Sequence, residues 1–275
     1  MKRFFVACAA VLAVSASLHA DVTVKQTITM SGGAAAMAGG MPMPTLTMRI
    51  KGLKARTDID VMGQTMTTIV DLAAKQMYVL NSADKTAKLV DLSAPAAGAP
   101  AAAAAAMPKI EGKFESTGKS QTIDGLTCDE YAFAMTVALG ETMGGRGAQM
   151  PPEAMEMMKD VKMVMNGSIW MTKTGPGVAE YIAFQKAAAD SPMASAIASS
   201  MGGSNGMDKV MTAVAKAQGM AYLTEIDMTM EGSGQMVEMM KQMGAMKMTN
   251  KVTDVSTAAI ADDLFKLPAG YTVSK

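Results

Sequence analysis

Apolar and polar residues alternate along much of the chain between positions 21 and 92. In the segment 21–30, Val22, Val24, Ile28 and Met30 fall on one side, while threonine and lysine residues fall on the other. Successive Cβ atoms of a β-strand point to opposite faces of a sheet, so this period of two predicts half-buried strands. Similar alternation or short apolar runs occupy the segments 46–51, 55–61, 67–72, 76–80 and 85–92. Short strands separated by tight turns indicate an antiparallel meander.

The second half of the chain mixes strand patterns with helix patterns. Strands are predicted within 110–136, where Asp124-Gly125 makes a turn, and again at 163–171, 222–230 and 246–255. Helical patterns occupy the segments 151–161, 193–201 and 207–214 and the region that follows Gly175-Pro176-Gly177. The pattern as a whole predicts a mostly β, α+β fold, in which two or three helices are inserted late into a sheet of about ten strands.

The first twenty residues have the pattern of a secretory leader. Lys2 and Arg3 precede an apolar run over 4–14, and a stretch rich in small residues ends at Ala20. That run is too short to span a bilayer, and no later segment is both long and apolar enough. We therefore expect cleavage near Ala20 and a periplasmic or secreted product without a transmembrane segment. Residues 21–275 are expected to form a single β domain, with the Ala/Pro-rich tract 93–108 as a surface loop.

The residue inventory excludes several kinds of catalytic chemistry. The only histidine, His19, and one of the two cysteines, Cys8, lie in the leader, so the exported product keeps one thiol, Cys128. A product without histidine cannot build a Ser-His-Asp triad or a Cys/His zinc site. A formal net charge of zero argues against electrostatic binding of nucleic acid. We expect a protein that is not an enzyme and needs no cofactor, with Cys128 as a buried apolar residue.

Methionine is unusually abundant, with 32 residues in a chain of 275. Most of them occupy inward positions of the patterns above, which favours simple core packing. Unbranched, polarizable thioethers also suit an apolar surface that repacks around ligands of varied shape. A third interpretation is Cu(I) binding, since thioethers are ligands for soft metals. Its candidate ligands are Met236, Met239, Met240 and Met243, which share one face if their segment is helical.

Several short stretches of the chain resemble a family of exported bacterial proteins, domain-of-unknown-function family 4412. These stretches are Arg56-Thr57-Asp58, Ile69-Val70-Asp71-Leu72, Gln76-Met77-Tyr78-Val79-Leu80, Gly118-Lys119, residues 123–131, Ile169-Trp170-Met171-Thr172-Lys173 and residues 264–271. The resemblance implies a fold similar to that of periplasmic lipoprotein carriers. Such a fold is a strongly curved antiparallel half-barrel with helices covering the concave face, and in the carriers that face holds acyl chains.

These observations favour an exported, non-enzymatic protein that binds a lipophilic ligand between its sheet and its helices. The ligand would be a lipid, a lipoprotein acyl chain or an apolar small molecule, and an envelope protein is a possible partner. The expected sheet lining is Met163, Met165, Ile169, Met171, Tyr222, Ile226 and Met228, and the expected cover is Met193, Ile197, Met207, Met211 and Val214. Two alternatives stay open. One is Cu(I) binding or oxidant scavenging by exposed methionines, and the other is an envelope interaction or sensor module with a self-filled core.

Overall fold

A computed structural model describes most of the chain that follows residue 20. The described residues are 21–33, 44–61, 63–93, 110–138, 160–191, 212–214, 216–233 and 235–274. The predicted leader, residues 94–108 of the Ala/Pro-rich tract and the predicted helix at 193–201 lie outside them. Most of the helices predicted at 151–161 and 207–214 also lie outside the described residues, although Ala213 and Val214 at the end of the second are helical.

The described strands form a twelve-stranded sheet with the order β12-β6-β5-β4-β3-β2-β1-β11-β10-β9-β8-β7. The strands are β1 (Val22–Ser31), β2 (Thr45–Lys51), β3 (Lys54–Val61), β4 (Gln64–Asp71), β5 (Gln76–Asn81), β6 (Thr86–Asp91), β7 (Ile110–Ile123), β8 (Leu126–Ala138), β9 (Lys162–Thr172), β10 (Met220–Glu231), β11 (Met246–Ser256) and β12 (Thr272–Ser274). Neighbouring strands run antiparallel, except that β12 runs parallel to β6. The predicted mostly β, antiparallel α+β fold is confirmed, with more strands than expected.

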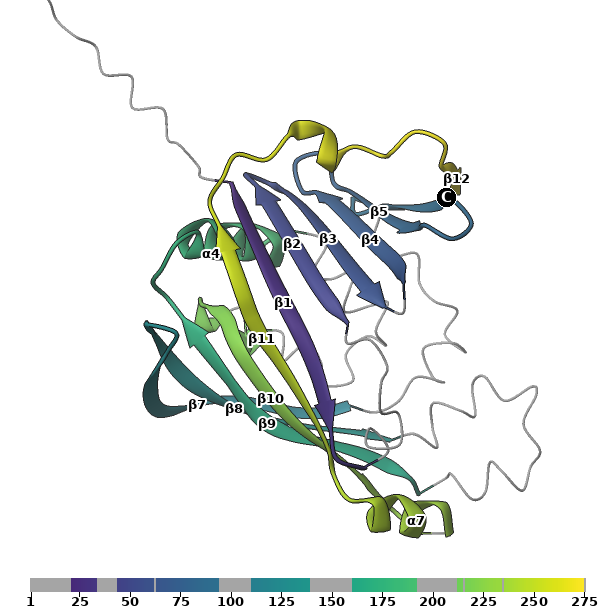
Figure 1. The fold of residues 1–275 in the computed structure, drawn as a ribbon, viewed down its shortest axis with the longest axis vertical. Helices are drawn as coiled ribbons and strands as arrows, with labels where there is room; N and C mark the ends of the chain where they lie inside the picture. Colours follow the sequence, from purple (N-terminus) through teal and green to yellow (C-terminus); the bar gives the residue numbers. More distant parts are fainter. Residues whose placement is uncertain are drawn as a thin grey trace, which may run out of the picture.

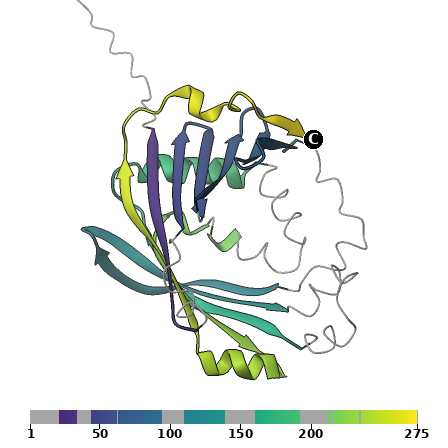
Figure 2. The same cartoon turned by 45° about the vertical axis from the view of Figure 1, so that its right-hand side comes forward.

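The middle of the sheet joins the two ends of the chain. β1 pairs with β2 on one side and with β11 on the other, so Thr23 lies opposite Arg49 and also opposite Ser256. The meander β1–β6 and the strands β7–β11 are thereby parts of the same sheet, whose edges are β12 and β7. Figure 2 shows that the sheet is not flat, because β7–β9 run in a different direction from β2–β5.

The helices whose bounds lie within the described residues are α4 (Val178–Ala189), α7 (Gln235–Met243) and the short 3₁₀-helix η3 (Asp262–Phe265). The prediction that Gly175-Pro176-Gly177 leads into a helix is confirmed. Gly177 is the residue before α4 and has a φ of 69°, and a Cβ there would lie 2.3 Å from Cγ2 of Val22. Only glycine fits this close, left-handed entry to the helix. No helix in the described part of the chain is long and apolar enough to cross a membrane.

The two faces of the sheet are covered by different parts of the chain. Val70 packs in the buried cluster that contains Val178 and Phe184 of α4, whereas its neighbour Ile69 packs with Leu267 and Tyr271 from the end of the chain. Adjacent residues of a strand point to opposite faces. We call these the α4 face and the C-terminal face. Figure 1 shows α4 behind β1 and β2, and the C-terminal segment running past the ends of these strands towards β12.

Candidate apolar binding face

α4 covers one part of the α4 face and forms the main core with it. Phe184 is 4% exposed, and the helix packs on strand residues that are almost completely buried. These residues are Val22, Val24, Ile50, Ala55, Val70, Met220, Tyr222 and Val252 of the strands and Leu72, which directly follows β4. Cys128 belongs to the same cluster and is fully buried, and burial raises the pKa of its thiol. The expectation of a buried Cys128 is confirmed.

A second buried cluster lies on the strands β7–β9. Phe114, Met171 and Ala217 are its buried members, and Ile169 and Val214 pack against them. The rings of Phe114 and Tyr131 stack with their centroids 4.9 Å apart. Ala217 and Val214 come from the chain segment before β10, so this segment covers part of the strands.

Between and beyond these clusters, methionines cross the sheet in rows. Met135 of β8 lies opposite Met165 of β9, which lies opposite Met228 of β10, which in turn lies opposite Met246 of β11. On one side of this row, Met163 of β9 lies opposite Met230 of β10. On the other side, Met248 of β11 lies between Ile226 of β10 and Met30 of β1. Directly opposed residues have Cβ atoms about 4.5–5.5 Å apart, so the thioethers of a row are neighbours. We call these eight methionines the methionine wall.

The methionine wall belongs to the α4 face but is not buried like the core around α4. Met30 has the same parity on β1 as Val22 and Val24, which belong to the core beside α4, and it lies opposite Met248. Met163 and Met165 have the same parity on β9 as Ile169 and Met171, which belong to the cluster of Val214. The wall residues are half-buried, and Met30 at its end is 44% exposed. The apolar character continues across β1 to Leu46, Ile59 and Met66 on the adjoining strands, and Met66 is 57% exposed. The described part of the α4 face therefore presents apolar side chains beyond those that its core buries.

The structure groups most of the predicted sheet lining. Met163, Met165, Ile169, Met171, Ile226 and Met228 share the α4 face on the paired strands β9 and β10. Tyr222 lies apart from them, since it is 8% exposed in the core beside α4 and its hydroxyl donates to Asp124 over 3.1 Å. Of the predicted cover residues, Val214 packs as described above, and Met193, Ile197, Met207 and Met211 lie outside the described residues.

Sequence reasoning missed α4 as a cover, and it missed Met135 as part of the lining. Apolar residues stand around most of the circumference of α4, so no single stripe marked its buried side. Met135 could have been found only by aligning β8 with β9, because the alternation within one strand does not show which residue lies opposite.

The predicted soft-metal ligands lie on α7, which is helical as the spacing required. Met239 is 56% exposed there, and the side chains of Met236, Met240 and Met243 lie outside the description. Within the described residues, no group of three or more histidine, cysteine, aspartate or glutamate side chains is placed to hold a metal ion. The methionine wall is a separate set of thioethers that the sequence analysis did not single out for metal binding.

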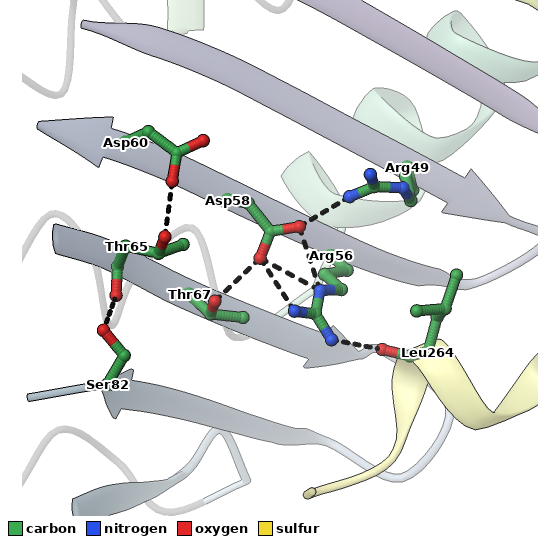
Figure 3. A network of polar contacts seen from close by, with 8 residues as sticks. All are labelled: Arg49, Arg56, Asp58, Asp60, Thr65, Thr67, Ser82 and Leu264. Atoms are coloured by element: carbon green, nitrogen blue, oxygen red, sulfur yellow. Dashed lines mark hydrogen bonds and ion pairs between the residues drawn. The ribbon is translucent and has the colours of Figure 1, made fainter. Parts of the chain in front are cut away.

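The C-terminal face carries a polar cluster, which Figure 3 shows. Asp58 accepts hydrogen bonds from Arg49 (2.5 Å), from Arg56 (3.0 Å) and from Thr67 (2.7 Å). Arg56 also donates to the carbonyl oxygen of Leu264 over 3.2 Å, which joins the cluster to η3. Burial would raise the pKa of Asp58, but the hydrogen bonds of Arg56 and Thr67 and the charges of both arginines hold that pKa below its ordinary value. The cluster fastens the C-terminal segment to the sheet.

Asp129 and Glu130, which are adjacent on β8, have separate partners. Asp129 accepts a hydrogen bond from Ser120 (2.7 Å) and pairs with Lys173 (3.4 Å), whereas Glu130 accepts from Thr117 (2.8 Å) and pairs with Lys119 (3.4 Å). The hydrogen bond from Ser120, followed by that from Lys173, lowers the pKa of Asp129. Neighbouring residues of β8 point to opposite faces, so each carboxylate has its own partners.

Comparison with solved structures gives an uncharacterized conserved protein from Thermus thermophilus. It has 6% identity and a TM-score of 0.36, and the match covers 94% of this chain and 91% of that one. A likeness of this size carries no argument about fold or ligand. No curated protein matches the chain. The sequence model of a domain of unknown function, DUF4412, matches residues 28–141, and this supports the resemblance to that family over the end of β1 and over β2–β8.

Proposed function

We propose that this chain is an exported, non-enzymatic protein that binds a lipophilic ligand against the methionine wall. In this proposal the sheet acts as a curved half-barrel of the lipoprotein-carrier type, and α4 and the segment before β10 cover part of its inner face. The protein would work in the periplasm or outside the cell after loss of the leader. A lipid, a lipoprotein acyl chain or another apolar molecule would occupy the uncovered part of the α4 face.

The observation that carries the proposal is the placement of thioethers in rows at half-buried positions. A methionine that serves only as core filling is expected to be buried, as Met171 and Met220 are at 4% and 0% exposure. The wall methionines instead keep exposed apolar surface on neighbouring strands, where one ligand can contact several of them. Exposed, contiguous apolar surface marks binding sites in soluble proteins, and methionine adapts to ligands of different shape.

The energetics suit an apolar guest. Removing apolar surface from water contributes roughly 25 cal/mol per Å², before the costs of association are subtracted. Charged residues of β10 and β11, such as Glu225 and Lys247, pair with each other on the opposite face and do not interrupt the wall. The ligand would therefore be bound by dispersion and desolvation rather than by charge.

Binding of the neutral probe N-phenyl-1-naphthylamine, followed by its fluorescence, tests the proposal. Wild-type protein is expected to bind the probe, and Met165→Gln/Met228→Gln is expected to weaken binding about tenfold or more, because a loss of about 1.4 kcal/mol is a tenfold change. Met239→Gln on exposed α7 is the matched control and should leave the affinity unchanged. Absence of probe binding by the wild type, or equal binding by the double variant, would refute the proposal.

Cu(I) binding is a second candidate that the row Met135–Met165–Met228–Met246 favours over the predicted site on α7. Neighbouring thioethers from three or four strands could share one soft metal ion. Met165→Leu/Met228→Leu separates the two functions, because leucine keeps the apolar surface and removes the sulfur atoms. Cu(I) titration against a competing chelator should then show a loss of affinity for this variant, while Met236/Met239/Met240/Met243→Leu remains like the wild type. Equal, weak Cu(I) binding by all three proteins would eliminate this candidate.

A further inference from the structure

A pair of amides interrupts the apolar α4 face between the core and the methionine wall. The side-chain nitrogen of Asn250 on β11 donates to the side-chain oxygen of Gln26 on β1 over 3.1 Å. Within the described part of the chain, the amide oxygen of Asn250 is buried from solvent and has no hydrogen-bond partner. A buried acceptor without a partner costs about 1–3 kcal/mol, so its presence in this face calls for a function.

Asn250 has a buried amide atom without a partner whichever way its amide nitrogen and oxygen are assigned. If both amides are turned over, the bond between Asn250 and Gln26 is kept with donor and acceptor exchanged. The amide nitrogen of Asn250 is then the buried group without a partner. In either orientation, a hydroxyl group satisfies the free atom of Asn250, because a hydroxyl both donates and accepts.

The described neighbours of Asn250 on its own face of the sheet are apolar or neutral. Along β11 it lies between Met248 and Val252 on the same face, and across the strands it lies opposite Ile28 and Thr224. The charged neighbours Lys247 and Lys251 belong to the other face of β11 and pair with Glu225 and Asp124. A charged ligand group would be desolvated here without a counter-charge, whereas a neutral hydroxyl would not meet that cost.

Met248 links this polar position to the methionine wall. It stands two residues from Asn250 on the same face of β11 and lies opposite Ile226 and Met30. A ligand with its apolar body on the wall would therefore have its polar end beside Asn250, and the hydroxyl of Thr224 lies on the adjoining strand. Because the free amide oxygen is closed to solvent, this contact requires flexible thioether side chains of the wall to move aside.

We infer that the ligand class is a neutral amphipath, with an apolar chain that lies along the methionine wall and a hydroxyl group that hydrogen-bonds to Asn250. This inference rests on the proposed function and specifies its ligand. Gln26 acts as a positioning residue, since its hydrogen bond fixes the amide of Asn250.

Displacement of N-phenyl-1-naphthylamine by 1-dodecanol and by tridecane, an alkane in which a methyl group replaces the hydroxyl, tests the inference. The alkane is the more apolar molecule and has neither donor nor acceptor, so binding driven by apolar burial alone favours the alkane. Wild-type protein is expected to bind the alcohol about 5–10-fold more tightly than the alkane, as one net hydrogen bond would give. Asn250→Leu should abolish this preference and keep the affinity for the alkane.

Asn166→Leu is the matched control, because Asn166 is an exposed residue of β9 on the opposite face, and the preference for the alcohol should survive there. A wild type that binds the alkane as tightly as the alcohol would overturn the inference and leave the proposed function standing. A preference that persists in Asn250→Leu would also overturn it. A wild type that does not bind the probe at all would refute the proposed function itself.

Discussion

Asp58 is the carboxylate whose surroundings tie the C-terminal segment to the sheet. Its side chain is 13% exposed and lies between two arginines, one of which also holds the carbonyl of Leu264. We expect Asp58→Asn to lower the free energy of unfolding by roughly 2–3 kcal/mol at neutral pH, because it leaves Arg49 and Arg56 partly buried without their counter-charge. Asp60→Asn, at an exposed position of the same strand, should change it by less than about 1 kcal/mol. Urea denaturation followed by circular dichroism measures both.

The stabilisation by Asp58 should also depend on pH. The folded-state pKa of Asp58 lies below its ordinary value, so the contribution is complete above an unfolded-state pKa of about 3.9 and is lost as the pH falls through the folded-state value. The difference in unfolding free energy between the wild type and Asp58→Asn is therefore expected to narrow below about pH 4. A difference that stays constant between neutral pH and pH 3 would contradict this origin of the stabilisation.

Two single positions show which features could be predicted from the sequence and which could not. Asp124-Gly125 was expected to be a turn, and the two residues have φ values of 48° and 82°, as the two-residue hairpin between β7 and β8 requires. The role of Asn250 could not be predicted in the same way, because its significance comes from the amide of Gln26, which lies 224 residues away in the chain.

At the scale of elements, the strands follow from the sequence and their partners do not. The alternation in 222–230 predicted a strand, and β10 is found at Met220–Glu231. The alternation of apolar and polar residues within one strand shows which of its residues share a face. The rows of the methionine wall depend instead on the register between neighbouring strands. A bulge beside Gln26 shifts the register between β1 and β11, and a bulge between Ala221 and Leu223 shifts the register between β9 and β10. The local sequence pattern did not predict either bulge. The bulge in β10 is also where Tyr222 joins the core beside α4 instead of the wall.

Gly167 sets the distance between β9 and β10 in the middle of the wall. It lies opposite Ile226, and a Cβ at this position would come within 1.9 Å of the carbonyl oxygen of Glu225. Gly167→Ala must therefore move one strand, and we expect it to destabilise the protein by about 2–3 kcal/mol and to weaken probe binding. Asn166→Ala, at the exposed neighbouring position, controls for the change in strand propensity. It should change neither the stability of the protein nor the affinity for the probe. A fully stable Gly167→Ala variant would show that the two backbones are farther apart than described.

The whole sheet could not be assembled from the sequence alone. The predicted meander accounts for β1–β6, since each strand pairs with the next in the chain. The pairing of β1 with β11 and of β12 with β6 joins segments from opposite ends of the chain, and such pairs leave no trace in local periodicity. The cover of the C-terminal face by Leu267 and Tyr271 follows from that topology, because β12 can reach β6 only if the segment before it crosses the sheet.

Mutations on the two faces should therefore have different effects on stability and on probe binding. Phe265 of η3 is 7% exposed, and η3 contacts β3 and β4, so Phe265→Ala is expected to lower the free energy of unfolding by about 3 kcal/mol. The wall lies on the other face, so the affinity for N-phenyl-1-naphthylamine should stay within about twofold of the wild type, which is under 0.5 kcal/mol. Met165→Gln/Met228→Gln should show the reverse, with weaker probe binding and a smaller loss of stability, because half-exposed side chains bury less apolar surface. If both variants lowered affinity and stability in parallel, the wall would be part of the folding core, and a self-filled module would replace ligand binding as the better interpretation.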